Sequence, residues 1–164
     1  ELLVGLGLGT VLVGEDPRLD EYDGEALYRS HTNGADQKAH QPRDFRDYWR
    51  TFREAMRLWS EDQLADLPES WAAFGQRVRG AVDTAAAGLA REEVALLVSS
   101  GGAIGRLIAD VMNAPAATAI ELNLQFRNTG MCELISGAGA LRLLSYNAVP
   151  HLDRPDRREA ITFA

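Results

Sequence analysis

The feature that most constrains this fold is a predicted strand, turn and helix in direct succession at residues 94–111. Residues 94–98 are an unbroken apolar run, which is typical of a strand covered on both faces, as in a parallel sheet. Two serines and two glycines at residues 99–102 end the run. Apolar residues then return with helical spacing at Ile104, Leu107, Ile108 and Val111. Open α/β sheets bind their ligands at such turns, at the carboxyl end of a strand.

The turn at residues 99–102 has the chemistry of an anion site. Gly101 and Gly102 allow another group to approach the backbone closely. The first turn of the following helix offers unpaired N–H groups and a partial positive charge, which favour an anion such as phosphate. In the alternative interpretation, the glycines only form the turn and the serines only cap the helix. The local pattern leaves both interpretations open.

Two well-defined catalytic motifs do not fit this turn. A nucleophile elbow requires Gly-x-Ser-x-Gly, and an elbow centred on Ser100 would need glycine where Val98 stands. A phosphate-binding loop requires Gly-x-x-x-x-Gly-Lys-Ser/Thr, and no such run occurs in the chain. A serine hydrolase that uses Ser100, an acid such as Asp110, and His151 has the right chain order. It stays open as an alternative, with Val98 against it.

Length and composition limit the classes of protein that remain. A chain of 164 residues, 46% of them hydrophobic, is sufficient for one domain with its own core. The net charge of −7 argues against a nucleic-acid-binding protein, which needs many cations to neutralise phosphates. No apolar run reaches the ~20 residues of a membrane-spanning helix. The single cysteine, Cys132, excludes an internal disulfide and favours a reducing compartment such as the cytoplasm.

The remaining segments are predicted to belong to one α/β domain. Residues 43–88 are expected to form a helical insertion, with an aromatic helix near 45–59 and a second helix at 71–87. The aromatic face is expected to pack into the core, and the alternative is that it caps a substrate pocket. Two β-like runs within 130–146 predict a hairpin. A short strand is predicted at 10–13 and an irregular loop at 30–42.

The order of these pieces resembles the histidine phosphatase (phosphoglycerate mutase-like) superfamily. The resemblance rests on the following residues: Leu19-Asp20-Glu21, Glu69-Ser70-Trp71, Phe74-Arg77-Val78, the turn 97–102, and the ending Ser145-Tyr146-Asn147-Ala148-Val149-Pro150-His151-Leu152. It covers nearly all of this chain but only the later part of a family domain. It implies a three-layer α/β/α sandwich with a mostly parallel sheet, a helical insertion and a C-terminal β-hairpin.

Two departures from the family pattern affect its chemistry. Family members begin with a strand that leads into Arg-His-Gly, whose histidine takes up the phosphoryl group, and no Arg-His-Gly occurs in the 164 residues. We expect that motif on an upstream segment, so that residues 1–164 form a single histidine-phosphatase-like domain without its N-terminal part. The second family histidine is replaced by Ser100, as in a branch of the family that carries serine or threonine there.

The resemblance implies a phosphomonoester hydrolase that forms a phosphohistidine, which water then hydrolyses. Glu21 matches the carboxylate that protonates the leaving oxygen, and Ser100 is placed to donate a hydrogen bond to phosphate. Ser99, Gly101 and Gly102 are the expected phosphate-binding residues.

His151 is expected either to border the pocket or only to anchor the last strand. The implied reaction needs no cofactor and no metal, and three histidines with one cysteine show no metal-ligand spacing. The expected partners are a small phosphorylated substrate and a second copy in a homodimer, with no nucleic acid and no membrane. Two alternatives stay open: a catalytically inactive member that serves as a binding module, and a phosphoglycerate mutase-type phosphotransferase.

Overall fold

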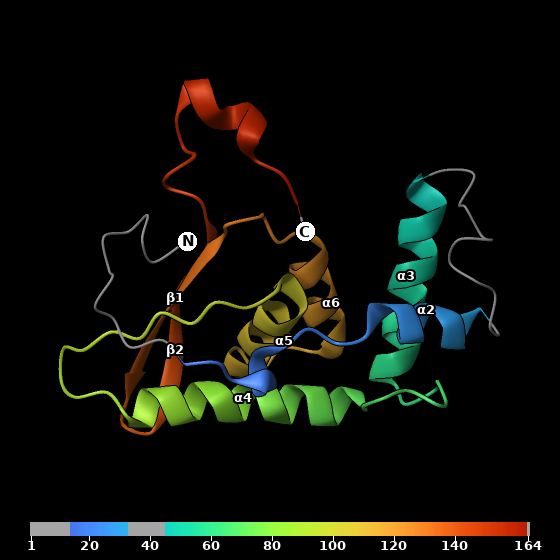
Figure 1. The fold of residues 1–164 in the computed structure, drawn as a ribbon, viewed down its shortest axis with the longest axis horizontal. Helices are drawn as coiled ribbons and strands as arrows, with labels where there is room; N and C mark the ends of the chain where they lie inside the picture. The colour runs from blue at the N-terminus through green and yellow to red at the C-terminus, as the bar shows by residue number, and fades with distance from the viewer. Residues whose placement is uncertain (1–13, 33–44, 164) are drawn as a thin grey trace.

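The computed structural model describes residues 14–32 and 45–163, and its elements follow one another as Figure 1 shows. Its α-helices are α2 (Gly24–His31), α3 (Phe45–Ser60), α4 (Trp71–Ala87), α5 (Gly101–Val111) and α6 (Ala116–Leu124). Strands β1 (Met131–Gly137) and β2 (Ala140–Ala148) pair antiparallel, and short 3-10 helices lie at Pro17–Leu19 and Pro155–Ala160. The strand predicted at 10–13 and most of the loop predicted at 30–42 lie outside the described residues. Among those residues, no helix is both long and apolar enough to cross a membrane.

The aromatic face of α3 forms the core together with α4, as the helical spacing predicted. Trp59 is 3% exposed, and its ring centroid lies 5.0 Å from that of Trp71. Tyr22, in the segment before α2, packs its ring 5.1 Å from that of Trp59 and 5.5 Å from that of Phe74. The segment that carries Glu21 is therefore held against the core by its neighbouring tyrosine.

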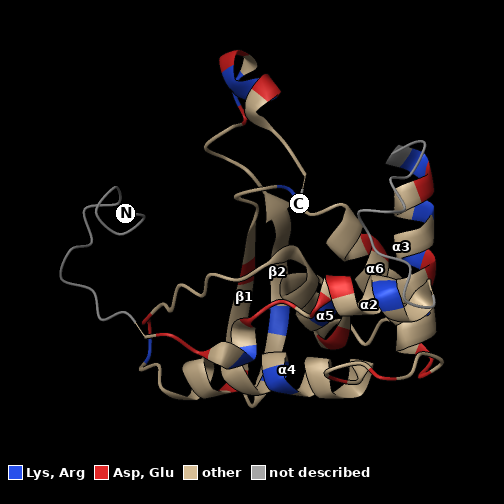
Figure 2. Ribbon diagram, turned by 45° about the vertical axis from the view of Figure 1, so that its right-hand side comes forward, with Lys and Arg blue, Asp and Glu red and all other residues tan. Residues whose placement is uncertain are grey.

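The outer face of α3 is charged, which completes its amphipathic pattern. Basic and acidic residues alternate along this helix in Figure 2. Arg57 pairs with Glu54 at 2.7 Å and with Glu61 at 2.6 Å, at the i,i+3 and i,i+4 spacings of one helical face. The apolar face of α3 is consequently turned toward α4 and α6.

A glycine brings α5 and α6 into close backbone contact. A Cβ at Gly105 would lie 2.9 Å from the Asn123 backbone nitrogen and 3.1 Å from the Ala119 carbonyl oxygen. The first distance is shorter than real Cβ contacts and the second is very tight, so a side chain here would push the two backbones apart. Figure 1 shows α5 and α6 side by side between the hairpin and α3. The packing fixes Asn123, near the C-terminal end of α6, relative to α5.

The structure corrects one prediction, because residues 94–98 do not form the expected buried strand. This segment precedes α5 as irregular backbone, with Val94 90% and Val98 67% exposed. Within the described residues the sheet is the β1–β2 hairpin, so the mostly parallel sheet of a three-layer sandwich is not observed there. A strand needs a neighbour for its N–H and C=O groups, and no described strand pairs with 94–98. An apolar run indicates that its side chains tend to be buried, but it does not indicate which other element buries them.

Candidate functional site

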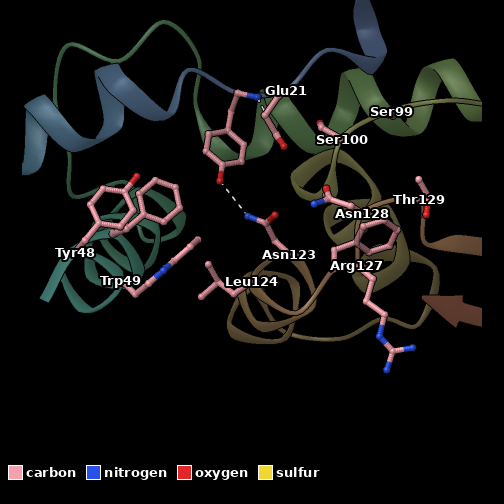
Figure 3. Close-up of a pocket in the computed structure, with 14 residues that line it drawn as sticks. Glu21, Tyr48, Trp49, Ser99, Ser100, Asn123, Leu124, Arg127, Asn128 and Thr129 are labelled. Carbon is pink, nitrogen blue, oxygen red and sulfur yellow. Dashed lines mark hydrogen bonds between the residues drawn. The ribbon is translucent and has the colours of Figure 1, made fainter. Parts of the chain in front are cut away.

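A pocket of about 370 Å³ opens at the N-terminal end of α5, between α3 and the segment that follows α6 (Figure 3). Its lining comprises Glu21 and Tyr22, residues 99–101, three aromatic residues of α3, and residues 123, 124 and 126–129. Residues 99–101 of the turn thus lie at a cavity, and Glu21 joins them there from far away in the chain.

The Glu21 carboxylate is held by two backbone N–H groups. Oε2 accepts from the Gly102 N–H at 2.9 Å, and Oε1 accepts from the Tyr22 N–H at 3.1 Å. A Cβ at Gly102 would overlap the Glu21 carboxylate, so glycine is required by this contact rather than by its own backbone conformation. The carboxylate occupies the positive end of the α5 dipole. Gly102, predicted to bind phosphate, therefore binds a side chain of the protein in this structure.

The two serines of the turn have different surroundings. Ser99 Oγ donates to the Leu19 carbonyl oxygen at 2.6 Å, which ties the segment before Glu21 to the turn. Ser100 is the N-cap residue of α5 but makes no side-chain cap bond. Ser100 lines the pocket, and its Oγ is buried with no hydrogen-bond partner among the described residues. A buried hydroxyl without a partner is uncommon in folded proteins, so Ser100 is available to a ligand in a way that Ser99 is not.

Arg77 of α4 holds the backbone that leads into Glu21. Its guanidinium donates to both carboxylate oxygens of Glu69, at 2.8 and 2.6 Å. It also donates to the carbonyl oxygens of Arg18 at 3.0 Å and Asp20 at 2.6 Å. The Glu69 carboxylate beside it raises the pKa of the Arg77 guanidinium. Glu69 and Arg77 contributed to the family resemblance without an assigned role. Together they hold the backbone segment that positions the Glu21 carboxylate.

Tyr22 lines the pocket, and its hydroxyl is held by a hydrogen bond. The Asn123 side-chain amide donates to the Tyr22 oxygen at 3.0 Å, as the dashed line in Figure 3 marks. Burial raises the pKa of Tyr22, and the neighbouring Glu21 charge adds to the effect. The phenol is consequently neutral over the physiological range and acts as a fixed dipole.

His151 lies outside the lining residues. It is exposed, and its Nε2 is 2.7 Å from Thr129 Oγ1, which does line the pocket. The structure thus places His151 shortly after strand β2 and beside a lining residue, but not among the lining residues themselves.

Comparison with known proteins decides the family. A family model described as the histidine phosphatase superfamily (branch 1) matches residues 3–149. The chain belongs to the histidine phosphatase superfamily. Membership implies a phosphoglycerate mutase-like α/β fold. No curated protein and no solved structure matches this histidine phosphatase family member with significance.

Several lining residues of this histidine phosphatase family member were not predicted as site residues. Asn123, Asn128 and Thr129 contribute polar groups. Tyr48 and Trp49 contribute rings, and they belong to the aromatic face for which a place over a substrate pocket was the alternative to core packing. The signal in the sequence was three consecutive polar residues, Arg127, Asn128 and Thr129, shortly after the helix at 116–124. For the described part of the chain, no group of histidine, cysteine, aspartate or glutamate side chains is arranged to hold a metal ion.

Proposed function

We propose that this protein is a phosphomonoester hydrolase that works through a phosphohistidine, with the nucleophilic histidine outside residues 1–164. The observation that carries the proposal is the meeting of the Glu21 carboxylate and the unpartnered Ser100 hydroxyl at the N-terminal end of α5. Residues 43–88 are, on this proposal, the helical insertion of the phosphatase domain.

The proposed reaction has two displacements at phosphorus. In the first, which requires Glu21 to be protonated when the substrate is bound, the histidine forms a P–N bond while the P–O bond to the alcohol breaks, and Glu21 gives its proton to the leaving oxygen. In the second, water attacks phosphorus, its proton passes to Glu21, and the P–N bond breaks. Ser100 and the Gly101 N–H donate hydrogen bonds to the phosphoryl oxygens throughout.

Ser100 makes the proposed phosphate site weaker than one built with two histidines. A neutral hydroxyl cannot supply the positive charge of a protonated imidazole. A charge-assisted hydrogen bond exceeds a neutral one by about 1–2 kcal/mol. The proposed enzyme is therefore expected to bind inorganic phosphate weakly and to release it readily.

The test is hydrolysis of p-nitrophenyl phosphate by residues 1–164 and by the chain extended to include an Arg-His-Gly segment. We expect turnover only from the extended chain, and Glu21→Gln to reduce its kcat by roughly 10²–10⁴-fold. Glu133→Gln, an exposed carboxylate on β1, is the matched control and should leave kcat unchanged.

The serine in place of histidine favours a second candidate, a binding module without turnover. That candidate is supported if the extended chain is folded, binds orthovanadate in calorimetry and hydrolyses no phosphate ester. A Ser100→His variant that acquires turnover would then attribute the missing activity to this one residue.

A further inference from the structure

We propose that the pocket selects phosphate esters of an uncharged aromatic alcohol, whose ring is held between Trp49 of α3 and Leu124 of α6. The inference rests on the proposed function, and it names the part of the substrate that leaves. It follows from the difference between the two ends of the pocket.

One end of the pocket is polar and the other is apolar. Figure 3 shows Ser100 and Glu21 on one side of the cavity, with Tyr48, Trp49 and Leu124 across from them. A volume of about 370 Å³ lies at the lower end of the range for small-molecule sites and exceeds the need of a phosphate alone. A phosphate bound at Ser100 therefore leaves its ester group in the apolar part.

The rings at the apolar end are already ordered. Tyr48 stacks on Phe52 with centroids 6.0 Å apart, and Trp49 meets the same Phe52 ring edge-on at 6.0 Å. Phe52 is buried in the core, whereas Tyr48 and Trp49 are half-buried and line the pocket. Rings that hold each other in place lose little freedom when a ligand ring packs on them. This arrangement favours a flat, rigid ester group.

The charge of the lining argues against a second anionic group on the substrate. Among the described lining residues, Arg127 is the one cation. Its guanidinium donates to the Asn147 carbonyl oxygen at 3.4 Å and points away from Ser100 in Figure 3. A carboxylate or second phosphate at the apolar end would lose its hydration without gaining a partner. Among the described residues, the apolar end thus offers no cation to the carboxylate of phosphoglycerate, the substrate of the mutase alternative.

The experiment compares three esters of primary alcohols, so that the leaving oxygens are chemically alike. The extended chain is assayed with benzyl phosphate, ethyl phosphate and 3-phosphoglycerate. We expect kcat/KM for benzyl phosphate to exceed that for ethyl phosphate by roughly tenfold or more, and 3-phosphoglycerate to be the poorest. Trp49→Ala and Leu124→Ala should each remove most of the preference for the benzyl ester, while Trp49→Phe should retain it. Leu144→Ala, an exposed apolar residue of β2 outside the pocket, is the control.

Binding of benzylphosphonate and ethylphosphonate, measured by calorimetry, separates this inference from the proposed function. If no ester is hydrolysed but benzylphosphonate binds roughly tenfold more tightly in a Trp49-dependent manner, the hydrolase proposal fails and the aromatic site stands. If esters are hydrolysed but benzyl and ethyl groups are equivalent, or Trp49→Ala weakens both equally, the aromatic site is refuted. A preference for 3-phosphoglycerate would refute it as well.

Discussion

The Gly102 backbone N–H donates to Glu21 Oε2 across a distance of 2.9 Å, joining two segments 81 residues apart in the sequence. This hydrogen bond brings a carboxylate to the first turn of α5, where the N–H groups of the helix favour negative charge. It also leaves no room for a side chain at residue 102. The position of the acid in the site consequently depends on a glycine that does no chemistry itself.

Gly102→Ala should displace Glu21 without unfolding the protein. The new methyl group overlaps the carboxylate and approaches the Tyr22 ring to 2.5 Å, and overpacking of this kind costs about 1–3 kcal/mol. We expect kcat to fall roughly as far as it does in Glu21→Gln, by 10²-fold or more. Gly88→Ala is the control, because a Cβ there meets only ordinary contacts at 3.6 and 3.7 Å. Unchanged kcat in Gly102→Ala would remove Glu21 from the proposed mechanism.

Arg77→Lys should lower kcat more than it alters KM. Lysine keeps the charge but cannot donate at once to both Glu69 oxygens and to the Asp20 carbonyl oxygen. The backbone before Glu21 is then held less firmly, at a cost of about 1–3 kcal/mol in the free energy of unfolding. Arg79→Lys, in an exposed pair with Asp83 on the same helix, should cost less than about 1 kcal/mol. Steady-state kinetics and urea unfolding of both variants provide the comparison. Equal effects of the two substitutions would contradict a special role for Arg77.

Gly105→Ala should destabilise the protein although alanine is the better helix former. Alanine normally gains up to about 1 kcal/mol over glycine inside a helix, but here its methyl group lies 2.9 Å from the Asn123 nitrogen. Separation of α5 from α6 should cost about 1–3 kcal/mol, measured by urea unfolding. Gly80→Ala on α4, whose added Cβ would lie 3.7 Å from the Arg18 guanidinium, should be neutral or stabilising. A stabilised Gly105→Ala would show that the two helices need not touch.

Stability should fall in alkali as Tyr146 ionises. Burial raises the pKa of Tyr146 to about 12, and its hydroxyl donates to the Leu122 carbonyl oxygen at 2.6 Å. Since the pKa in the folded state lies above the ordinary value near 10, the stabilisation is fully present below pH 10 and is lost as the pH rises through 12. Urea unfolding between pH 9 and 12 should show this decline, and Tyr146→Phe should reduce it. The same decline in the phenylalanine variant would assign it to other groups.

Local elements were predictable wherever neighbouring residues determine them. Gly88 ends α4 as expected, and its N–H donates to the Thr84 and Ala85 carbonyl oxygens. The hairpin within 130–146 formed as predicted because its strands are close in the chain. The helix α2, in contrast, was not predicted, because residues 24–31 show no clear apolar stripe beyond Leu27 and Tyr28.

The site was only partly predictable, because it is made of long-range contacts. The turn at 99–102 was found from its glycines, but nothing in the sequence indicates that Gly102 binds Glu21 rather than a ligand. Helical spacing placed Trp49 and Trp59 on one face, yet it could not show that Trp59 is buried while Trp49 lines a pocket. The prediction of a buried strand at 94–98 was wrong. A strand depends on a pairing partner elsewhere in the fold, which the local sequence does not reveal.

The glycine contact between α5 and α6 has a mechanical consequence. Two helices in backbone contact move as one rigid block, so Ser100 and Leu124 keep their separation whatever the pocket contains. On the side of Trp49 and Leu124, a wider cavity requires α3 to move away from α6. The exposed ion pair of Arg53 with Glu121 joins these two helices at 2.8 Å, and such a pair resists opening by no more than about 1 kcal/mol. A larger ester is therefore expected to displace α3, while α5 and α6 keep their positions relative to each other.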